Sequence, residues 1–217
     1  MNEELYHLYN TRQPDFEAVI SQFRGTDLAG PLLMTTNTLY QQQKNPLLIV
    51  GQETNGWSYL HGNEVRKQMA TYEAFNVGED YYASPFWNVT RKVEKAVGGV
   101  PYSCAWTNIS KFDVEGGRSY GEQERIIATV DDVLVAEINI LKPTVCLFFS
   151  GPHFDTRLKH IFPGITYEAV PNWSERQLAR LVHPGLPTHT FRTYHPNYLR
   201  RSGREAAFVE FVKSLPL

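Results

Sequence analysis

The chain has 217 residues, 42% of them hydrophobic, and a formal net charge of −2. This length suits one domain with a sizeable core, and the charge does not predict nucleic-acid binding by the molecule as a whole, so any basic surface must be local. The chain starts with acidic residues instead of a signal peptide and has no apolar run of membrane-spanning length, so we expect a cytoplasmic protein without membrane contact.

The two cysteines, Cys104 and Cys146, show no metal-ligand spacing and lie in apolar segments. They are expected to be buried thiols of a reduced compartment, where disulfides are rare. The histidines also lack the i, i+4 spacing of metal ligands on a helix. We therefore expect no metal site, no other cofactor, and a monomer.

The first half of the chain alternates helical and strand patterns. Apolar residues recur at helical spacing from Phe16 to Phe23, and Ser84 with Pro85 gives a hydroxyl N-cap and a first-turn proline. A short apolar run without alternation suits a strand that is buried on both faces. The expected elements are a helical cap over 1–40, a buried strand over 47–50, and helices over 64–76 and 85–97.

The second half continues this alternation. A helix rich in isoleucine and valine is stopped by Pro143, and another amphipathic helix closes the chain. Strands that alternate with helices predict a single three-layer α/β/α domain over 1–217, with a central, mainly parallel sheet of four or five strands. The expected strands lie over 102–107, 144–149, 165–170 and 188–193, and the helices over 122–141 and 203–213.

Each main strand ends in small or polar residues. Glu53 follows the first strand, Asn108 ends the second, and His195 follows the last. Because the carboxyl ends of parallel strands meet at one edge of a sheet, we expect these residues to converge on one cleft. A carboxylate, an amide and an imidazole can together serve acid–base chemistry and ligand recognition. The alternative is an ordinary exit from strand to loop, at which Gly51 serves backbone geometry alone.

In order and residue type these strand ends resemble the motifs of the uracil-DNA glycosylase superfamily. The first motif of that family reads Gly-Gln-Asp-Pro-Tyr-His, its second strand end carries an asparagine, its third a Trp-Gly pair, and its last motif reads His-Pro-Ser-Pro-Leu-Ser. The resemblance spans roughly residues 47–211. The matching segments are Gly51-Gln52-Glu53-Thr54-Asn55-Gly56, Trp106-Thr107-Asn108, Ser150-Gly151 and His195-Pro196-Asn197-Tyr198-Leu199-Arg200.

The resemblance implies a DNA glycosylase, which flips uracil or a related deaminated base out of DNA and hydrolyses its bond to the sugar. Glu53 would position water or stabilise the cationic sugar, and His195 would donate to the anion that develops on the leaving base. Asn108 would read the Watson–Crick edge, with Gln52 and Asn55 as further base-binding residues. The partner is then single- or double-stranded DNA, or a nucleobase.

The last motif also implies contacts to DNA. In the family this loop probes the minor groove with an apolar wedge, for which Tyr198 and Leu199 are the matching residues. Arg200, Arg201 and Arg204 could meet phosphates, and the alternative is a solvated basic face. Three aromatic residues are candidates for stacking on the base: Trp57, Tyr81 and Tyr82.

The chain departs from the family pattern in its first motif. Glu53 replaces an aspartate and is one methylene longer, and Asn55 stands where the family has a tyrosine that excludes the thymine methyl group. Two cysteines cannot hold the four-cysteine iron–sulfur cluster of some branches. These departures leave open a second function, a catalytically degenerate domain of the same fold that binds a nucleobase or DNA without cutting.

A serine or amide hydrolase is a further alternative, with Ser150, Asp113 and His195 as the triad. The Gly-x-Ser-x-Gly pattern of a nucleophile elbow is absent, because Phe148 stands in the place of the leading glycine.

Overall fold

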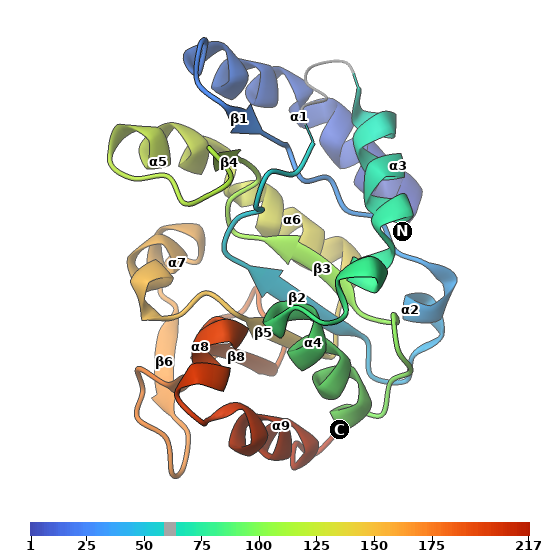
Figure 1. Ribbon diagram of the computed structural model, residues 1–217, viewed down its shortest axis with the longest axis vertical. Coiled ribbons are helices and arrows are strands. Elements are labelled where there is room, and N and C mark those ends of the chain that lie inside the picture. Colours follow the sequence, from blue (N-terminus) through green and yellow to red (C-terminus); the bar gives the residue numbers. More distant parts are fainter. Residues whose placement is uncertain (59–63) are drawn as a thin grey trace.

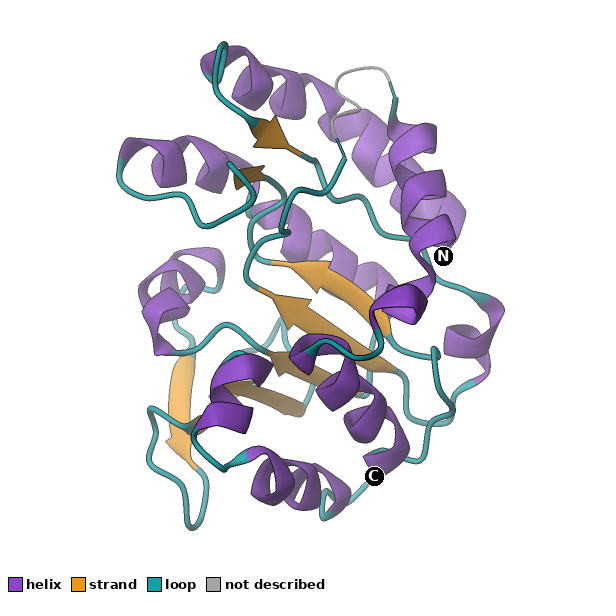
Figure 2. Cartoon of the chain, viewed as in Figure 1, coloured by secondary structure: helices purple, strands orange, loops and turns teal. Residues whose placement is uncertain are grey.

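A mixed, mainly parallel sheet lies at the centre of the protein (Figure 1 and Figure 2). The computed structural model describes residues 1–58 and 64–217. Within these ranges the strands of the sheet are β2 (Leu47–Gly51), β3 (Ala105–Asn108), β5 (Val145–Phe148), β6 (Thr166–Ala169), β7 (Leu178–Val182) and β8 (His189–Thr193). Their order is β3-β2-β5-β8-β7-β6, with β3, β2, β5 and β8 parallel to one another and β7 and β6 paired antiparallel.

The α/β class and the mainly parallel sheet are confirmed, but the expected number of four or five strands is wrong. The described residues form six, because the sequence predicts no strand at β7, which has alanine, a poor strand former, and a charged arginine at its centre. Pairing on both sides holds this segment in the sheet, with Glu168 of β6 opposite Arg180 of β7. Their side chains form an ion pair of 3.3 Å across the two strands.

The parallel strands are covered by helices, and every residue of β2 and β5 is buried. One group of helices in mutual contact consists of α4 (Pro85–Ala96), α8 (Pro196–Arg201) and α9 (Glu205–Lys213). In the second group, α1 (Asn2–Gln22) contacts α3 (Val65–Phe75) and α6 (Asp132–Leu141). Figure 1 shows the sheet between the two groups. The remaining elements are β1 (Leu28–Ala29), β4 (Asp113–Val114), α2 (Thr38–Gln42), α5 (Glu122–Ile127), α7 (Asp155–Ile161) and the 3₁₀ turns η1 (Asn76–Tyr81), η2 (Ala128–Val130) and η3 (Pro152–Phe154).

Several predicted helices differ from the observed ones. The helix start at Ser84 is confirmed, since its hydroxyl accepts a hydrogen bond from the backbone N–H of Trp87 at 3.3 Å. The N-terminal helix α1 is much longer than the pattern from Phe16 to Phe23 suggests, and it continues through Pro14. The helix expected over 122–141 is broken into α5, η2 and α6, and α8 was not predicted. At the break, Asp131 accepts a hydrogen bond of 2.6 Å from Nε of Arg157.

No helix in the described part of the chain is long and apolar enough to cross a membrane. Cys104 and Cys146 are free and buried, as expected.

A fully buried ion pair joins α6 to the segment after β3. Nζ of Lys111 donates to Oε2 of Glu137 and to the hydroxyl of Thr107, each at 2.6 Å. The hydroxyl of Tyr9 in α1 donates to the other carboxylate oxygen at 2.8 Å. Lys111 and Glu137 are both 0% exposed, so either charge would be costly without its partner. The network therefore ties α1, α6 and the sheet edge together.

We expect Lys111→Met to lower the free energy of unfolding by about 3 kcal/mol, because it leaves the Glu137 carboxylate buried without its counter-charge. Replacing both partners, as Lys111→Met with Glu137→Leu, is expected to cost less than the single change. Urea unfolding at neutral pH measures both. Lys95→Met, at an exposed position on α4, is the control. A loss at Lys111 no larger than at Lys95 would contradict this account.

Candidate functional site

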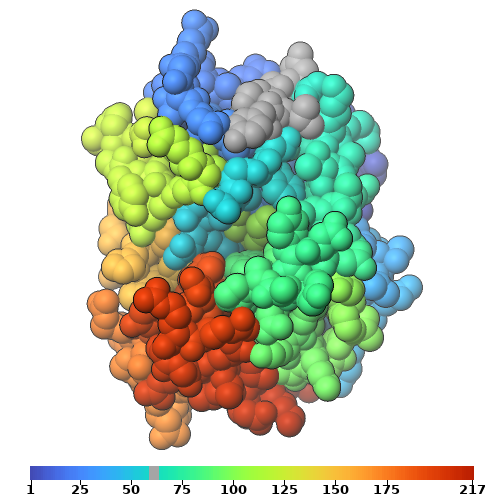
Figure 3. Space-filling view, in the orientation of Figure 1, coloured from blue at the N-terminus to red at the C-terminus, as the bar shows by residue number. Residues whose placement is uncertain are grey.

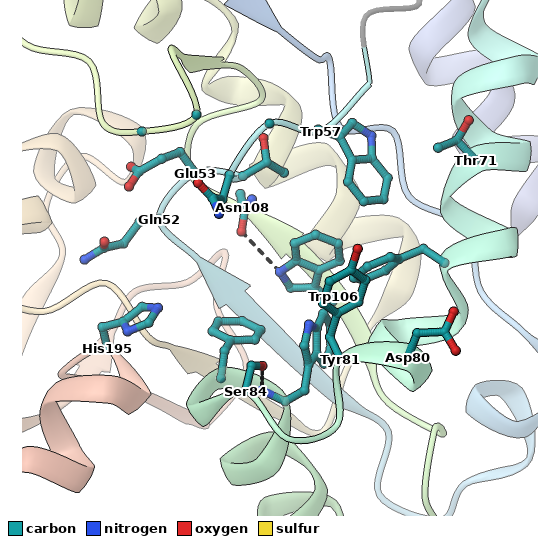
Figure 4. Close-up of a pocket in the computed structure, with 18 of the residues that line it drawn as sticks. Gln52, Glu53, Trp57, Thr71, Asp80, Tyr81, Ser84, Trp106, Asn108 and His195 are labelled. Carbon is teal, nitrogen blue, oxygen red and sulfur yellow. Dashed lines mark hydrogen bonds between the residues drawn. The ribbon is translucent and has the colours of Figure 1, made fainter.

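A cavity of about 730 Å³ opens at the carboxyl ends of the parallel strands. Figure 3 shows this face of the molecule, on which the segment after β2 (cyan), α4 (green) and α8 (red) surround a hollow. The residues predicted for chemistry and base binding line it together: Gln52, Glu53, Asn55, Asn108 and His195. Segments far apart in sequence are thus brought to one pocket (Figure 4).

The pocket lies where the chain reverses its direction across the sheet. β2 connects to β3 on one side, whereas the strands that follow β5 in the chain, β6, β7 and β8, all lie on the other side. Such a switch point leaves a crevice between the two strand ends, and ligands of open α/β sheets bind there. Nε2 of Gln52 crosses it and donates to the backbone oxygen of Ser150 at 2.7 Å. Gln52 therefore holds the ends of β2 and β5 together beside the pocket.

The amide of Asn108 is fixed in one orientation. Its Oδ1 accepts a hydrogen bond from Nε1 of Trp106 at 3.2 Å, and an indole N–H can only donate, so the amide oxygen must face Trp106. The Nδ2 atom is buried and has no hydrogen-bond partner within the protein. Asn108 is 1% exposed, and an unsatisfied buried donor is costly. The amide group is therefore ready to donate to a ligand.

Gly51 makes room for this amide. It stands beside Asn108 in the register of β2 and β3, and a Cβ atom at Gly51 would lie 2.2 Å from Oδ1 of Asn108. Its φ is not positive. The alternative that Gly51 serves backbone geometry alone is therefore wrong, because a side chain at this position would clash with the amide of Asn108.

Glu53 is half-buried and carries one unsatisfied carboxylate oxygen. Its Oε2 is buried without a hydrogen-bond partner. Burial raises the pKa of Glu53 to about 7, against the opposing effect of the cationic side chains of Arg118 and Arg157. A carboxylate with such a pKa can exchange a proton near neutral pH.

Asp113 holds the loop that carries Glu53. It is fully buried, and its carboxylate accepts hydrogen bonds from the hydroxyl of Thr54 and from the backbone N–H groups of Gly56 (3.2 Å) and Trp57 (3.3 Å). These charge-assisted bonds fix the backbone directly after Glu53. From the sequence, Asp113 is a candidate only for the alternative hydrolase triad, because no local pattern indicates that it binds this loop.

His195 is a neutral hydrogen-bond donor. Its Nδ1 accepts the backbone N–H of Asn197 at 3.2 Å, so the proton of the neutral ring lies on Nε2. Burial lowers the pKa of His195, which favours this neutral form. The ring lies 5.7 Å from that of Phe86, centroid to centroid.

Aromatic side chains form the other wall of the pocket. The rings of Trp57 and Phe75 lie 5.6 and 5.5 Å from Trp106, and Tyr81 lies 5.5 Å from Phe75. Of the three candidates for base stacking, Trp57 and Tyr81 line the pocket. Tyr82 is 65% exposed and is not one of the described residues that line it.

The residues predicted to contact DNA lie on α8 and just after it, outside the pocket. Tyr198 is 52% exposed, whereas Leu199 is fully buried and could not act as a wedge in this conformation. Arg200 pairs with Glu205 at 2.7 Å and also donates to Asn88. The guanidinium of Arg204 lies over the ring of Trp173, and Arg201 is exposed.

The residues of the alternative hydrolase triad are not connected to one another. The hydroxyl of Ser150 is buried without a hydrogen-bond partner, Asp113 binds the loop after Glu53, and Nδ1 of His195 accepts from Asn197. A nucleophile and its base should lie within hydrogen-bonding reach. The described residues also contain no cluster of three or more His, Cys, Asp or Glu side chains that could hold a metal ion.

Comparison with protein-family models and with curated proteins found no match to this chain.

The raised pKa of Glu53 makes stability depend on pH. The folded protein favours the protonated acid, so the contribution of Glu53 to stability is fully present below pH 4.5, its ordinary pKa, and is lost as the pH rises through about 7. We expect Glu53→Gln to be more stable than the natural protein above pH 7, by on the order of 3 kcal/mol, with the difference vanishing below pH 4.5.

Urea unfolding across this pH range measures the difference. Glu73→Gln, at an exposed position on α3, controls for the loss of one carboxylate. A stability difference that does not change between acid and neutral pH would show that Glu53 is not buried as described.

Proposed function

We propose that this protein is a divergent member of the uracil-DNA glycosylase superfamily that hydrolyses the N-glycosidic bond of uracil or a related deaminated base in DNA. One observation carries the proposal. A carboxylate oxygen without a partner, an amide donor without a partner and a neutral imidazole donor line one pocket, and they come from Glu53, Asn108 and His195. Such a set of groups can serve the hydrolysis of a nucleobase–sugar bond.

The fixed amide of Asn108 favours a deaminated base. Its Nδ2 offers N–H donors to the pocket, and Oδ1 keeps a second lone pair beside the one used by Trp106. Deamination replaces an exocyclic amino group, which donates, by a carbonyl oxygen, which accepts. Nδ2 would therefore pair with the carbonyl of the deaminated base and would face a competing donor on cytosine or adenine. The buried, unsatisfied Nδ2 makes this discrimination stronger than it would be in water.

His195 and Glu53 supply the two halves of the reaction. As the bond between C1′ and the base nitrogen breaks, negative charge develops on the base and positive charge on the sugar. Nε2–H of His195 would donate a hydrogen bond to a base oxygen, a type of contribution worth about 3 kcal/mol in a site that excludes water. The Glu53 carboxylate would orient a water molecule toward C1′ and accept its proton, and the leaving base takes up a proton on release.

The position of the pocket in the fold also supports the proposal. It lies at the carboxyl ends of parallel strands and at a switch point, where ligands of α/β sheets bind, and residues of three of the four motif segments line it: Glu53, Asn108 and His195. The alternative of a degenerate binding domain is favoured by one observation. Because the pKa of Glu53 is about 7, about half of the molecules carry a protonated Glu53 at pH 7. A protonated carboxyl group cannot act as a base.

Release of a free base from DNA separates the two functions. We expect the protein to release uracil, or another deaminated base, from an oligonucleotide panel under enzyme excess. Glu53→Gln should lower the rate by about a hundredfold or more while leaving oligonucleotide binding intact, because it removes the general base but keeps the shape. Chromatography of released bases measures the rate, and Glu73→Gln is the control. If the natural protein releases no base but still binds the same oligonucleotides, the glycosylase function is wrong and the degenerate binding domain is supported.

The rate of excision should also depend on pH through Glu53. Its carboxylate form is required, so below a pH of about 7 the rate should fall about tenfold per pH unit, and above that value it should level off. Single-turnover rates between pH 5 and 9 test this. A rate that stays constant down to about pH 5 would mean that a different group accepts the proton.

A further inference from the structure

The pocket is longer than the proposed reaction needs. Its volume of about 730 Å³ lies in the range that holds a drug-sized ligand, and a single uracil ring fills a small part of it. Figure 4 shows Gln52, Glu53 and His195 at one side, with Asp80 and Thr71 at the far side and Trp57, Trp106 and Tyr81 between them. The base-cleaving groups therefore occupy one end, and an aromatic chamber with its own polar groups occupies the other.

Two polar groups at the far side of this chamber, on Asp80 and Thr71, can accept hydrogen bonds, and one indole N–H of the wall, Nε1 of Trp57, is buried without a partner in the protein. Asp80 is exposed, and its carboxylate can only accept. The hydroxyl of Thr71 already donates its proton to the backbone oxygen of Lys67 at 3.0 Å, so its oxygen is left as an acceptor. None of the described residues that line the pocket is a lysine or an arginine. A phosphate or carboxylate in the chamber would face the carboxylate of Asp80, and no lysine or arginine of the described lining would neutralise it.

An unusual backbone bend presents this side of the chamber. Asn76, Val77 and Gly78 all have positive φ, at 42°, 49° and 75°. This region is unfavourable for a β-branched residue such as Val77. Gly78 is needed for a second reason, because a Cβ atom there would lie 2.2 Å from the ring of Trp87, another residue of the wall. The bend carries Asp80 and Tyr81 to the pocket, and strain of this kind is concentrated at functional sites.

We propose that the aromatic chamber is a second subsite, and that the base this protein removes carries a bulky substituent that is rich in hydrogen-bond donors and has no negative charge. The inference rests on the proposed glycosylase function and specifies its substrate. A hydroxyl-rich ring such as a sugar would pack its C–H face on Tyr81 and Trp57 and donate to Thr71 and Asp80. An ammonium group would meet the same aromatic faces and the same carboxylate.

Binding of modified oligonucleotides tests the subsite without relying on turnover. The probes are single-stranded oligonucleotides with one thymine, one uracil, or one uracil whose C5 carries a glucosyloxymethyl, an aminopropyl or a carboxyethyl group. Fluorescence anisotropy with the Glu53→Gln protein gives each Kd. We expect a donor-bearing substituent to tighten binding about tenfold over plain uracil, an effect of about 1.4 kcal/mol, and the carboxyethyl group to give no gain. The glucosyl and aminopropyl probes distinguish a hydroxyl-rich from an ammonium substituent.

Substitutions at exposed positions locate the effect. Tyr81→Ala and Asp80→Asn should each remove most of the tenfold gain, measured as the ratio of the Kd for plain uracil to the Kd for the substituted uracil in the same variant. Asp80→Asn should also leave the affinity for plain uracil unchanged. Tyr82→Ala and Glu79→Gln are the matched controls, since both residues are adjacent in sequence and do not belong to the described lining of the pocket. Because Tyr81 is 58% exposed and Asp80 is also exposed, these changes should not affect folding.

The outcomes separate the subsite from the glycosylase proposal. If uracil binds more tightly than thymine but neither donor-bearing substituent adds affinity, the subsite is overturned and the base site stands. If a substituent adds affinity that Tyr81→Ala removes, the subsite is supported. This holds even if uracil and thymine bind equally well, a result that would contradict only the recognition of the base by Asn108. Equal binding of all five probes overturns both the subsite and the reading of the base by Asn108, whereas the release of free base from the oligonucleotide panel tests the glycosylase function separately.

Discussion

The site depends on a space that a single glycine leaves between two parallel strands. The register of β2 and β3 sets Gly51 beside Asn108, and a Cβ atom there would lie 2.2 Å from Oδ1 of Asn108 and 3.4 Å from Nε1 of Trp106. These two atoms form the hydrogen bond that orients the amide. Any larger residue would displace the amide from this position and so disturb its hydrogen bond with the indole. One backbone register thus determines what the pocket recognises.

Two carboxylates lie close to this floor and have different tasks. Asp113 is buried with its oxygens occupied by the hydroxyl of Thr54 and by backbone N–H groups, so it contributes to the structure of the loop. Glu53, on the same loop, is left with one oxygen unsatisfied. Burying such a group is costly, and the protein tolerates that cost because Asp113 holds the backbone around it. Two neighbouring carboxyl groups commonly take different roles when their surroundings differ in burial and hydrogen bonding.

The sequence was sufficient for features that depend on local pattern. Continuous apolar runs predict β2 and β5, Ser84 and Pro85 predict the start of α4, and the rule that parallel strand ends converge predicts that Glu53, Asn108 and His195 share a pocket. Features that depend on distant partners could not be predicted. β7 owes its conformation to pairing with β6 and β8.

The same limit applies within the site. The role of Asp113 depends on contacts with a loop far away in the sequence. The role of the Trp106 indole depends on the side-chain positions at the end of β3, which only the structure shows. The hydrogen bond from Trp106 joins residues two apart in the chain, yet alternation in a strand would equally allow an indole packed in the core. Leu199 fits an apolar wedge by motif, but the structure forms a helix there and uses this side chain to anchor it.

That helix connects the fold to the chemistry through one atom. Nδ1 of His195 accepts the backbone N–H of Asn197 and so caps α8, and the same bond requires that Nδ1 carry no proton. Protonation of the ring would turn the acceptor into a donor and would break the cap, which adds to the burial that already lowers the pKa of His195. The positive end of the α8 dipole also lies at this ring and disfavours a second positive charge. The helix therefore holds His195 as a neutral Nε2–H donor, and the buried Leu199 fixes the helix against the core so that this donor keeps its direction toward the pocket.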